Sequence, residues 1–200
     1  MIDLMHGPHF AKSYVTDYLR NDLPKRLVSY RNGWNVDDIT LPTPAQFINF
    51  EPIGLDEWPS IITVAISMAG TERIGFDRGN PEYRVVYNMR TYVWVKTEFP
   101  DLATLMRDRL TTVVRSALLD YPCLKATDPR QTFQAMIDEG TIREEYSDLT
   151  LLKGDRVLAG SYLSYELAIN EIVMRENIGQ VQEVDLTVTG YGIKQTDLDP

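Results

Sequence analysis

The feature that most constrains this chain is one long run of alternating residues at positions 83–97. One set of alternate positions is mostly apolar and holds Tyr83, Val85, Tyr87, Met89, Thr91, Val93 and Val95. The intervening positions mix charged, polar and aromatic side chains: Arg84, Val86, Asn88, Arg90, Tyr92, Trp94 and Lys96. Successive side chains of a strand point to opposite faces of a sheet. The pattern therefore predicts a long strand with one face in the core and a chemically mixed face opposite.

Two segments predict helices that could cover the apolar face. Residues 8–31 carry an apolar stripe at helical spacing, which includes Leu19, Leu23 and Leu27. Pro24 interrupts it, so we expect either a kink or two abutting helices, ended by Asn32-Gly33. The second helix begins with Asp101 as its N-cap and ends before Pro122.

Further strands are predicted around this frame. The expected strands are residues 61–67, 149–152, 157–173 and 181–191, with an extended piece at 46–50. Residues 70–81 are rich in Gly, Asp and Asn and predict a hairpin loop. Asp128-Pro129 and Gly140 favour a short helix over 129–139.

Together these elements predict one α+β domain over residues 1–200. Its antiparallel or mixed sheet is covered on one face by two helices, with loop or short-helix insertions at 39–57 and 124–148 and a C-terminal tail at 192–200. A hydrophobic content of 44% and a charged content of 24% fit a globular chain of this kind. Since two helices cover only one face, we expect the other face to meet solvent or another chain.

Motifs that carry chemistry are missing from the sequence. It has no phosphate-binding loop, no G-x-S-x-G and no H-E-x-x-H. His6 and His9 could hold a metal with Asp3 on one helical face, but Gly7-Pro8 interrupts that stretch. Cys123 follows a helix C-terminus and is expected to be a small buried hydrophobe. The carboxylate pairs are expected on solvated loops: Asp37-Asp38, Asp56-Glu57, Glu144-Glu145, and Asp197 with Asp199.

We therefore expect no catalytic residues, no cofactor and no metal. The net charge of -9, from 20 basic and 29 acidic residues, disfavours a surface that grips nucleic-acid phosphates. No signal peptide and no apolar run of membrane-spanning length are predicted. With a single cysteine, the chain is expected to be made in a reducing cytoplasm.

Aromatic residues supply the candidate functional site. Trp34, Trp58, Tyr92 and Trp94 lie in or beside loops or on the mixed face of the long strand. Each of them could fill a core, and together they could anchor a protein contact, because Trp, Tyr and Arg are enriched in interface hot spots. The candidate interface residues are Trp58, Arg84, Val86, Arg90, Tyr92 and Trp94.

The order of elements resembles a known family. A helix is followed by the proline-rich lead into Trp58-Pro59-Ser60-Ile61-Ile62-Thr63-Val64, the long strand, a second helix, and the strand Val184-Asp185-Leu186-Thr187-Val188-Thr189. This set resembles the tail terminator proteins of long-tailed bacteriophages, and more loosely other head–tail connector and tail-tube-related ring proteins.

That resemblance implies a structural virion protein. Such proteins form a ring, usually of six subunits, that caps the tail tube and joins it to the head–tail connector protein, while DNA passes through the lumen unbound. The implied partners are further copies of the chain, the tail tube protein and the connector. An acidic lumen would repel DNA, with Arg84 and Arg90 turned toward neighbouring chains. Residues 71–80, 124–148 and 192–200 are expected to be mobile docking segments. The alternatives are another neck or tail-tube ring subunit, or a small enzyme or ligand-binding domain with its site in the loops.

Overall fold

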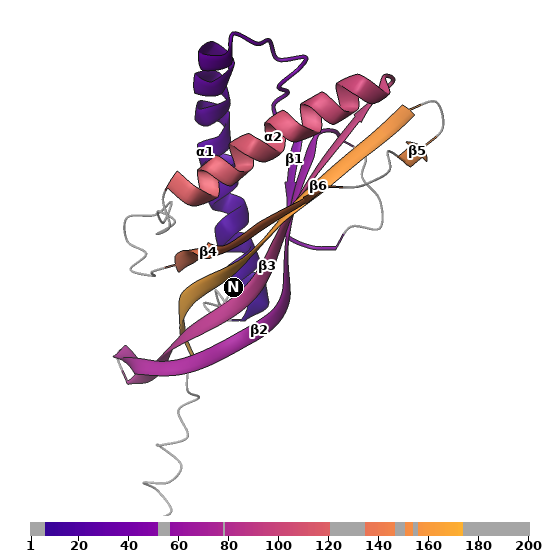
Figure 1. The fold of residues 1–200 in the computed structure, drawn as a ribbon. Helices are drawn as coiled ribbons and strands as arrows, with labels where there is room; N and C mark the ends of the chain where they lie inside the picture. The colour runs from indigo at the N-terminus through magenta and orange to yellow at the C-terminus, as the bar shows by residue number, and fades with distance from the viewer. Residues whose placement is uncertain are drawn as a thin grey trace, which may run out of the picture.

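The computed structural model describes residues 7–51, 57–77, 79–120, 135–146, 151–153 and 156–173. In chain order the elements are α1 (Pro8–Trp34), β1 (Gln46–Ile48), β2 (Ser60–Asp77), β3 (Asn80–Thr97), α2 (Pro100–Asp120), β4 (Ala135–Tyr146), β5 (Leu151–Lys153) and β6 (Arg156–Ile172) (Figure 1). The predictions for His6, Cys123, the strand at 181–191 and the tail at 192–200 fall outside the described residues.

The strands form one mixed sheet. Its order is β1-β2-β3-β6-β4, and the short β5 pairs with the beginning of β6. β1 runs parallel to β2, whereas the other pairs are antiparallel. The predicted α+β class, with a mixed sheet and two helices, is confirmed.

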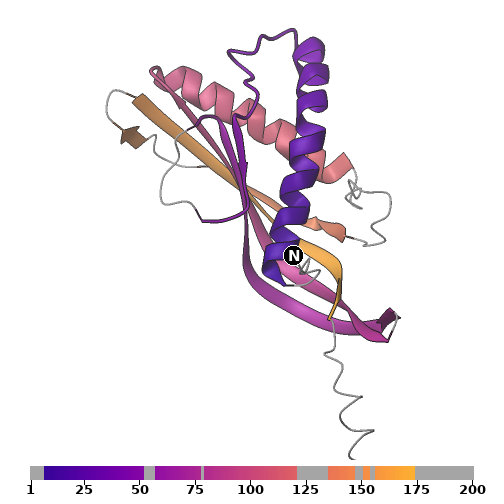
Figure 2. The same ribbon diagram turned by 180° about the vertical axis from the view of Figure 1, so that it is seen from behind.

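The β3–β6 pair forms the spine of the sheet. Its register runs without a break from Glu82 opposite Ile172 to Thr97 opposite Val157. As the alternation predicted, one side of both strands is buried: Val85, Tyr87, Met89, Thr91, Val93 and Val95 on β3, and Leu163, Tyr165, Leu167 and Ile169 on β6. α2 packs over β3 and β6, and α1 packs against β2 and α2, so both helices cover this buried face (Figures 1 and 2).

α1 is one helix that continues through Pro24. Leu19, Leu23 and Leu27 are fully buried, while Pro24 is exposed, so sheet packing on both sides of the proline maintains the helix. The predicted stop at Asn32-Gly33 is wrong by a few residues. The helix ends at Trp34 and is capped by Asn35, whose φ of 53° is left-handed, while the Val36 amide donates to the Arg31 carbonyl at 3.0 Å.

The predicted loop at 70–81 is wrong, because β2 continues to Asp77 and β3 begins at Asn80. The resulting hairpin extends beyond the helices at the lower left of Figure 1. β2 carries three irregularities, between Ala65 and Ser67, Met68 and Gly70, and Arg73 and Gly75. Glycine is common at such bulges, so Gly70 and Gly75, which suggested a loop, instead mark bends in a strand.

β4 replaces the predicted helix over the described part of 129–139. Ala135 and Ile137 are buried opposite Ile169 and Leu167 of β6, while Met136 is exposed. This burial against a neighbouring strand outweighs the local helix-start signal. Within the predicted insertion at 124–148, the described residues Ala135–Tyr146 are therefore a strand of the sheet and not a loop or short helix.

Candidate functional site

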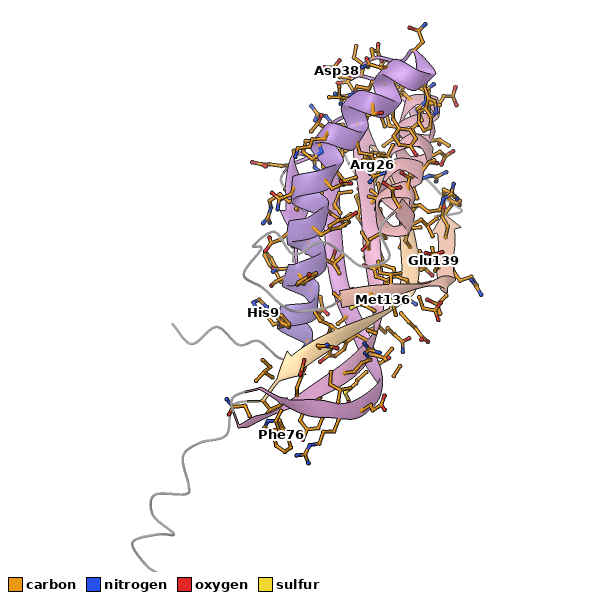
Figure 3. All side chains as sticks on the ribbon, turned by 90° about the vertical axis from the view of Figure 1, so that its left-hand side faces the viewer. His9, Arg26, Asp38, Phe76, Met136 and Glu139 are labelled. Atoms are coloured by element: carbon orange, nitrogen blue, oxygen red, sulfur yellow. The ribbon has the colours of Figure 1, made fainter. Side chains whose placement is uncertain are left out.

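The candidate site is the sheet face opposite the helices, here called the open face. Among the described elements, both helices pack on the other side of the sheet. The open face carries the even-numbered side chains of β3 and β6, together with Ile62 and Val64 of β2 and Met136 of β4. Figure 3 shows how the β2–β3 hairpin, with Phe76 near its end, projects past the end of α1 that holds His9.

Trp94 lies on the open face directly opposite Gly160 of β6. A Cβ atom added at Gly160 would lie 2.6 Å from ring carbon Cζ3 of Trp94. The indole therefore occupies the space above the glycine, and only glycine leaves room for it. The close packing holds the Trp94 ring flat against the sheet.

A polar and aromatic cluster lies beside Trp94. The rings of Tyr92 and Tyr162, directly opposite each other on β3 and β6, have centroids 5.4 Å apart. The Tyr162 hydroxyl donates a hydrogen bond to the Glu145 carboxylate of β4, and the Arg90 guanidinium lies 4.7 Å from the Tyr162 ring centroid. The interaction with Glu145 raises the pKa of Tyr162, and interaction with the Tyr92 hydroxyl raises the pKa of Arg90. Three strands thus hold one charged aromatic cluster.

Part of the open face is a small second core. Ile48, Ile62 and Val64 are each no more than 7% exposed and pack with Tyr92 and Trp94. Tyr92 and Trp94 can therefore act both as core residues and as interface anchors, because both side chains pack against this small core and stay partly exposed. At the same end of the face, the Lys96 ammonium lies 5.7 Å from the Trp58 ring centroid.

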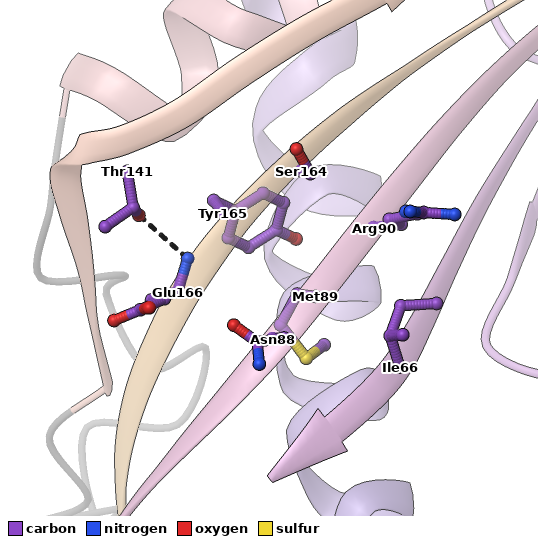
Figure 4. Close-up of a pocket in the computed structure, with 8 residues that line it drawn as sticks. All are labelled: Ile66, Asn88, Met89, Arg90, Thr141, Ser164, Tyr165 and Glu166. Atoms are coloured by element: carbon purple, nitrogen blue, oxygen red, sulfur yellow. Dashed lines mark hydrogen bonds between the residues drawn. The ribbon is translucent and has the colours of Figure 1, made fainter. Parts of the chain in front are cut away.

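Two hollows lie along the middle of the open face. The larger, of about 600 Å³, is lined by Val86, Met136 and Ala168 among acidic side chains that include Asp138, Glu139 and Glu166. The smaller, of about 180 Å³, is lined by Ile66, Asn88, Arg90, Thr141 and Glu166, among others (Figure 4). There the Glu166 amide donates to the Thr141 hydroxyl at 2.9 Å. Both hollows are lined by apolar and charged side chains together, a mixture that is common at protein contact surfaces.

Charge is unevenly divided across the open face. The basic side chains Arg84, Arg90 and Lys96 lie along β3, whereas Glu166 of β6 and Asp138, Glu139 and Glu145 of β4 lie toward the opposite edge. Arg143 of β4 is a basic exception on the acidic side, and Glu72 of β2, opposite Arg84, is an acidic exception on the basic side. A face with one basic side and one acidic side is complementary to a second copy placed beside it.

The structure brings together most of the predicted interface residues. Arg90, Tyr92 and Trp94 lie in one cluster, Trp58 flanks it through Lys96, and Val86 lines the larger hollow. Arg84 lies farther along β3, opposite Glu72 and Asn170. Trp34 is not part of this face, because it packs against Tyr30 at the end of α1.

Sequence reasoning missed the partners from other strands: Glu145, Gly160 and Tyr162. The alternating pattern of β6 indicates its buried, odd-numbered positions. Gly160 and Tyr162 occupy even-numbered positions, which lie on the open face. Glu144 and Glu145 were expected on a solvated loop. They lie on β4 and point to opposite faces, where Glu144 accepts from Arg115 of α2 at 2.6 Å.

Within the described residues, no group of three or more potential metal ligands comes together. His9 lies exposed near the start of α1. No described helix is long and apolar enough to cross a membrane. Comparison with models of known protein families and with curated proteins gives no match.

Proposed function

We propose that this chain is a structural subunit that forms a homo-oligomeric ring at the head–tail joint of a bacteriophage, as a tail terminator. The ring, of six subunits by the resemblance, caps the tail tube and joins it to the connector while DNA passes through its lumen. The chain works by assembly, with no catalytic step.

The observation that supports the proposal best is the open face. It presents partly exposed Tyr92, Trp94 and Tyr162 together with the exposed Met136, which is 43% accessible. Soluble monomers rarely expose a contiguous patch of this kind, and patches rimmed by polar residues mark contact sites. Aromatic anchors next to arginine are typical of interface hot spots.

The division of charge favours a head-to-tail arrangement of subunits. In a ring, one part of each subunit meets a different part of the next, and the rotation closes. The basic β3 side of one copy can face the acidic β4 side of its neighbour, which fixes the direction of packing.

The overall charge suits a channel for DNA. A net charge of -9 leaves excess carboxylates, which repel the phosphates of a passing duplex. The basic side chains of β3 lie among aromatic rings on the open face, in positions suited to contacts between subunits.

The test is the copy number and shape of the assembled protein. We expect native mass spectrometry to give a closed oligomer and electron microscopy to show rings with a central hole, either alone or in particles that contain the chain. A single copy in each assembled particle would refute the proposal. Rings whose neighbours are a portal or only tube protein would instead identify an adaptor or a tail-tube subunit.

A pair of surface variants tests the face itself. Met136→Arg places a bulky cation on the acidic side of the open face, and we expect it to abolish ring formation with the fold retained. Val28→Arg changes an apolar side chain that is 54% exposed on α1, away from the open face, and should leave rings intact. If Met136→Arg formed rings as completely as Val28→Arg, the open face would be excluded as the ring contact.

A further inference from the structure

The outer edge of β2 is long and apolar. β1 pairs with β2 only at Ser60–Ile62. Beyond Ile62, up to Asp77, no described strand pairs with the outer side of β2. This stretch carries four apolar side chains with large accessible fractions: Ile66 at 52%, Met68 at 61%, Ile74 at 42% and Phe76 at 56%.

An exposed sheet edge of this kind is prone to pair with another chain. Its unpaired N–H and C=O groups are a template for another strand, and exposed apolar side chains add to the risk of aggregation. The three bulges in β2 bend the edge but leave these side chains accessible. Natural sheets commonly protect such an edge by covering or pairing it.

The described chain ends close to this edge. β6 finishes at Ile172 opposite Glu82, and the Val173 amide donates to the Pro81 carbonyl at 3.1 Å. Glu82 in turn lies opposite Gly75 of β2, near the end of the hairpin. The chain therefore leaves the sheet two strands away from the free edge and continues to Pro200.

The sequence after this point contains a matching segment. In residues 181–191, Val184, Leu186 and Val188 alternate with Asp185, Thr187 and Thr189. Such alternation predicts a strand with one apolar face. We propose that residues 181–191 of the same chain form an antiparallel strand along the outer edge of β2, with the apolar face on the side of Met68 and Phe76, which lie opposite Tyr87 and Pro81 of β3.

The dimensions agree with this placement. At about 3.3 Å per residue, the connection 174–180 spans up to roughly 23 Å, whereas three strand spacings from β6 to the outer side of β2 measure about 14 Å. A strand over 181–191 is about 37 Å long, and the free stretch of β2 is under about 50 Å. Since the segment enters at the hairpin end and β2 runs toward that end, the two strands are antiparallel.

The inference does not depend on the ring, and amide hydrogen exchange tests it. In the full chain, we expect the β2 amides between Thr63 and Asp77 that point away from β3 to exchange slowly. A chain that stops after Gln180 should lose this protection by roughly tenfold or more, because an unpaired edge amide is open to water. A chain that lacks only residues 192–200 should keep it. Fast exchange of these amides in the full chain would overturn the proposal.

Point variants and dilution identify the strand and its source. Leu186→Asp places a charge on the apolar face and should remove the protection, while Thr187→Asp on the opposite face should retain most of it. Equal effects of the two variants would contradict the assigned face. Protection within one chain is independent of protein concentration. Protection that falls on dilution would mean that a second copy supplies the strand, and would overturn the intramolecular assignment.

Discussion

Gly160 and Trp94 form the closest packing on the open face, and their geometry gives a prediction at the scale of one residue. Gly160→Ala would place a methyl group 2.6 Å from the Trp94 ring, so the ring must move off the sheet. We expect the free energy of unfolding to fall by about 1–3 kcal/mol, as in other overpacked sites. Urea denaturation would measure this change.

Gly33→Ala is the matched control. Gly33 lies in α1, and a Cβ atom there would meet no other atom within 4 Å. Alanine is a better helix former than glycine by about 1 kcal/mol in a helix interior, so this variant should be neutral or more stable. A Gly160→Ala protein as stable as the wild type would show that the ring is not confined.

Buried tyrosines predict a loss of stability at alkaline pH. Burial raises the pKa of Tyr165 and Tyr87 above the usual value of 10, and burial, reinforced by Asp22, raises the pKa of Tyr18 to about 12. Above pH 10 the unfolded chain releases protons that the folded chain retains, so the stability present below pH 10 falls as pH rises toward the folded values. The slope is about 1.4 kcal/mol per pH unit for each such tyrosine.

The variant Tyr165→Phe isolates one of these groups. It should lose about 1 kcal/mol at pH 8, because the hydrogen bond with the Thr91 hydroxyl at 2.9 Å is removed. Its stability should then decline less steeply than that of the wild type between pH 10 and about 11.5. Thr91→Val removes the same bond but leaves the phenol, so it should keep the steep decline. Parallel curves for Tyr165→Phe and the wild type would contradict the assignment.

At this scale, the sequence predicted one side of each long strand and missed the other side of β6. The apolar positions from Val85 to Val95 are identifiable because their environment is the same along the strand. Tyr162 and Gly160 matter only through the residues opposite them, and that register depends on how β3 and β6 align. A single sequence does not contain this pairing.

Between elements, Arg26 links the two helices. It contacts Asp22 of its own helix at 2.7 Å, and Ser116 and Asp120 of α2 at 3.2 and 2.9 Å. The side chain is only 16% exposed. We expect Arg26→Met to lower the free energy of unfolding by about 1–2 kcal/mol, because a shared network of charge-assisted bonds is lost.

Arg20→Met provides the comparison on the same helix. Arg20 pairs with Asp17 one turn away, both side chains are about half exposed, and its one bond to another element is a long one of 3.3 Å to the Phe47 carbonyl of β1. Surface pairs of this type contribute roughly 0–1 kcal/mol. Chemical denaturation should therefore show a smaller loss of unfolding free energy for Arg20→Met than for Arg26→Met. A larger loss for Arg20→Met would refute the bridging role of Arg26.

The elements that sequence predicted well are those whose packing pattern repeats over many residues. α1, α2, β3 and β6 belong to this class. The errors fall where local composition and tertiary packing disagree: Gly70 and Gly75 suggest a loop but lie in bulges of β2, and the Asp128-Pro129 signal is followed by β4, paired with β6. Pro24 likewise suggests a break in a helix that its buried neighbours keep continuous.

For the molecule as a whole, the net charge predicts weak interaction with DNA. With 29 acidic and 20 basic residues, the purified full chain should show no appreciable duplex binding at about 0.15 M salt. Electrophoretic mobility shift at several salt concentrations would measure it. Tight binding that weakens steeply with added salt would show that basic residues contact phosphates, and would contradict the proposed ring through which DNA passes unbound.

The unbroken β3–β6 ladder also has a mechanical consequence. All irregularities of the hairpin are in β2, while sixteen successive residue pairs join β3 to β6. A pull on the hairpin along the direction of β3 loads the hydrogen bonds of that ladder in shear, so that they share the force and must break together. The bulged strand can bend while its partner resists extension. The projecting hairpin can therefore bend in β2 while β3 stays firmly attached to β6.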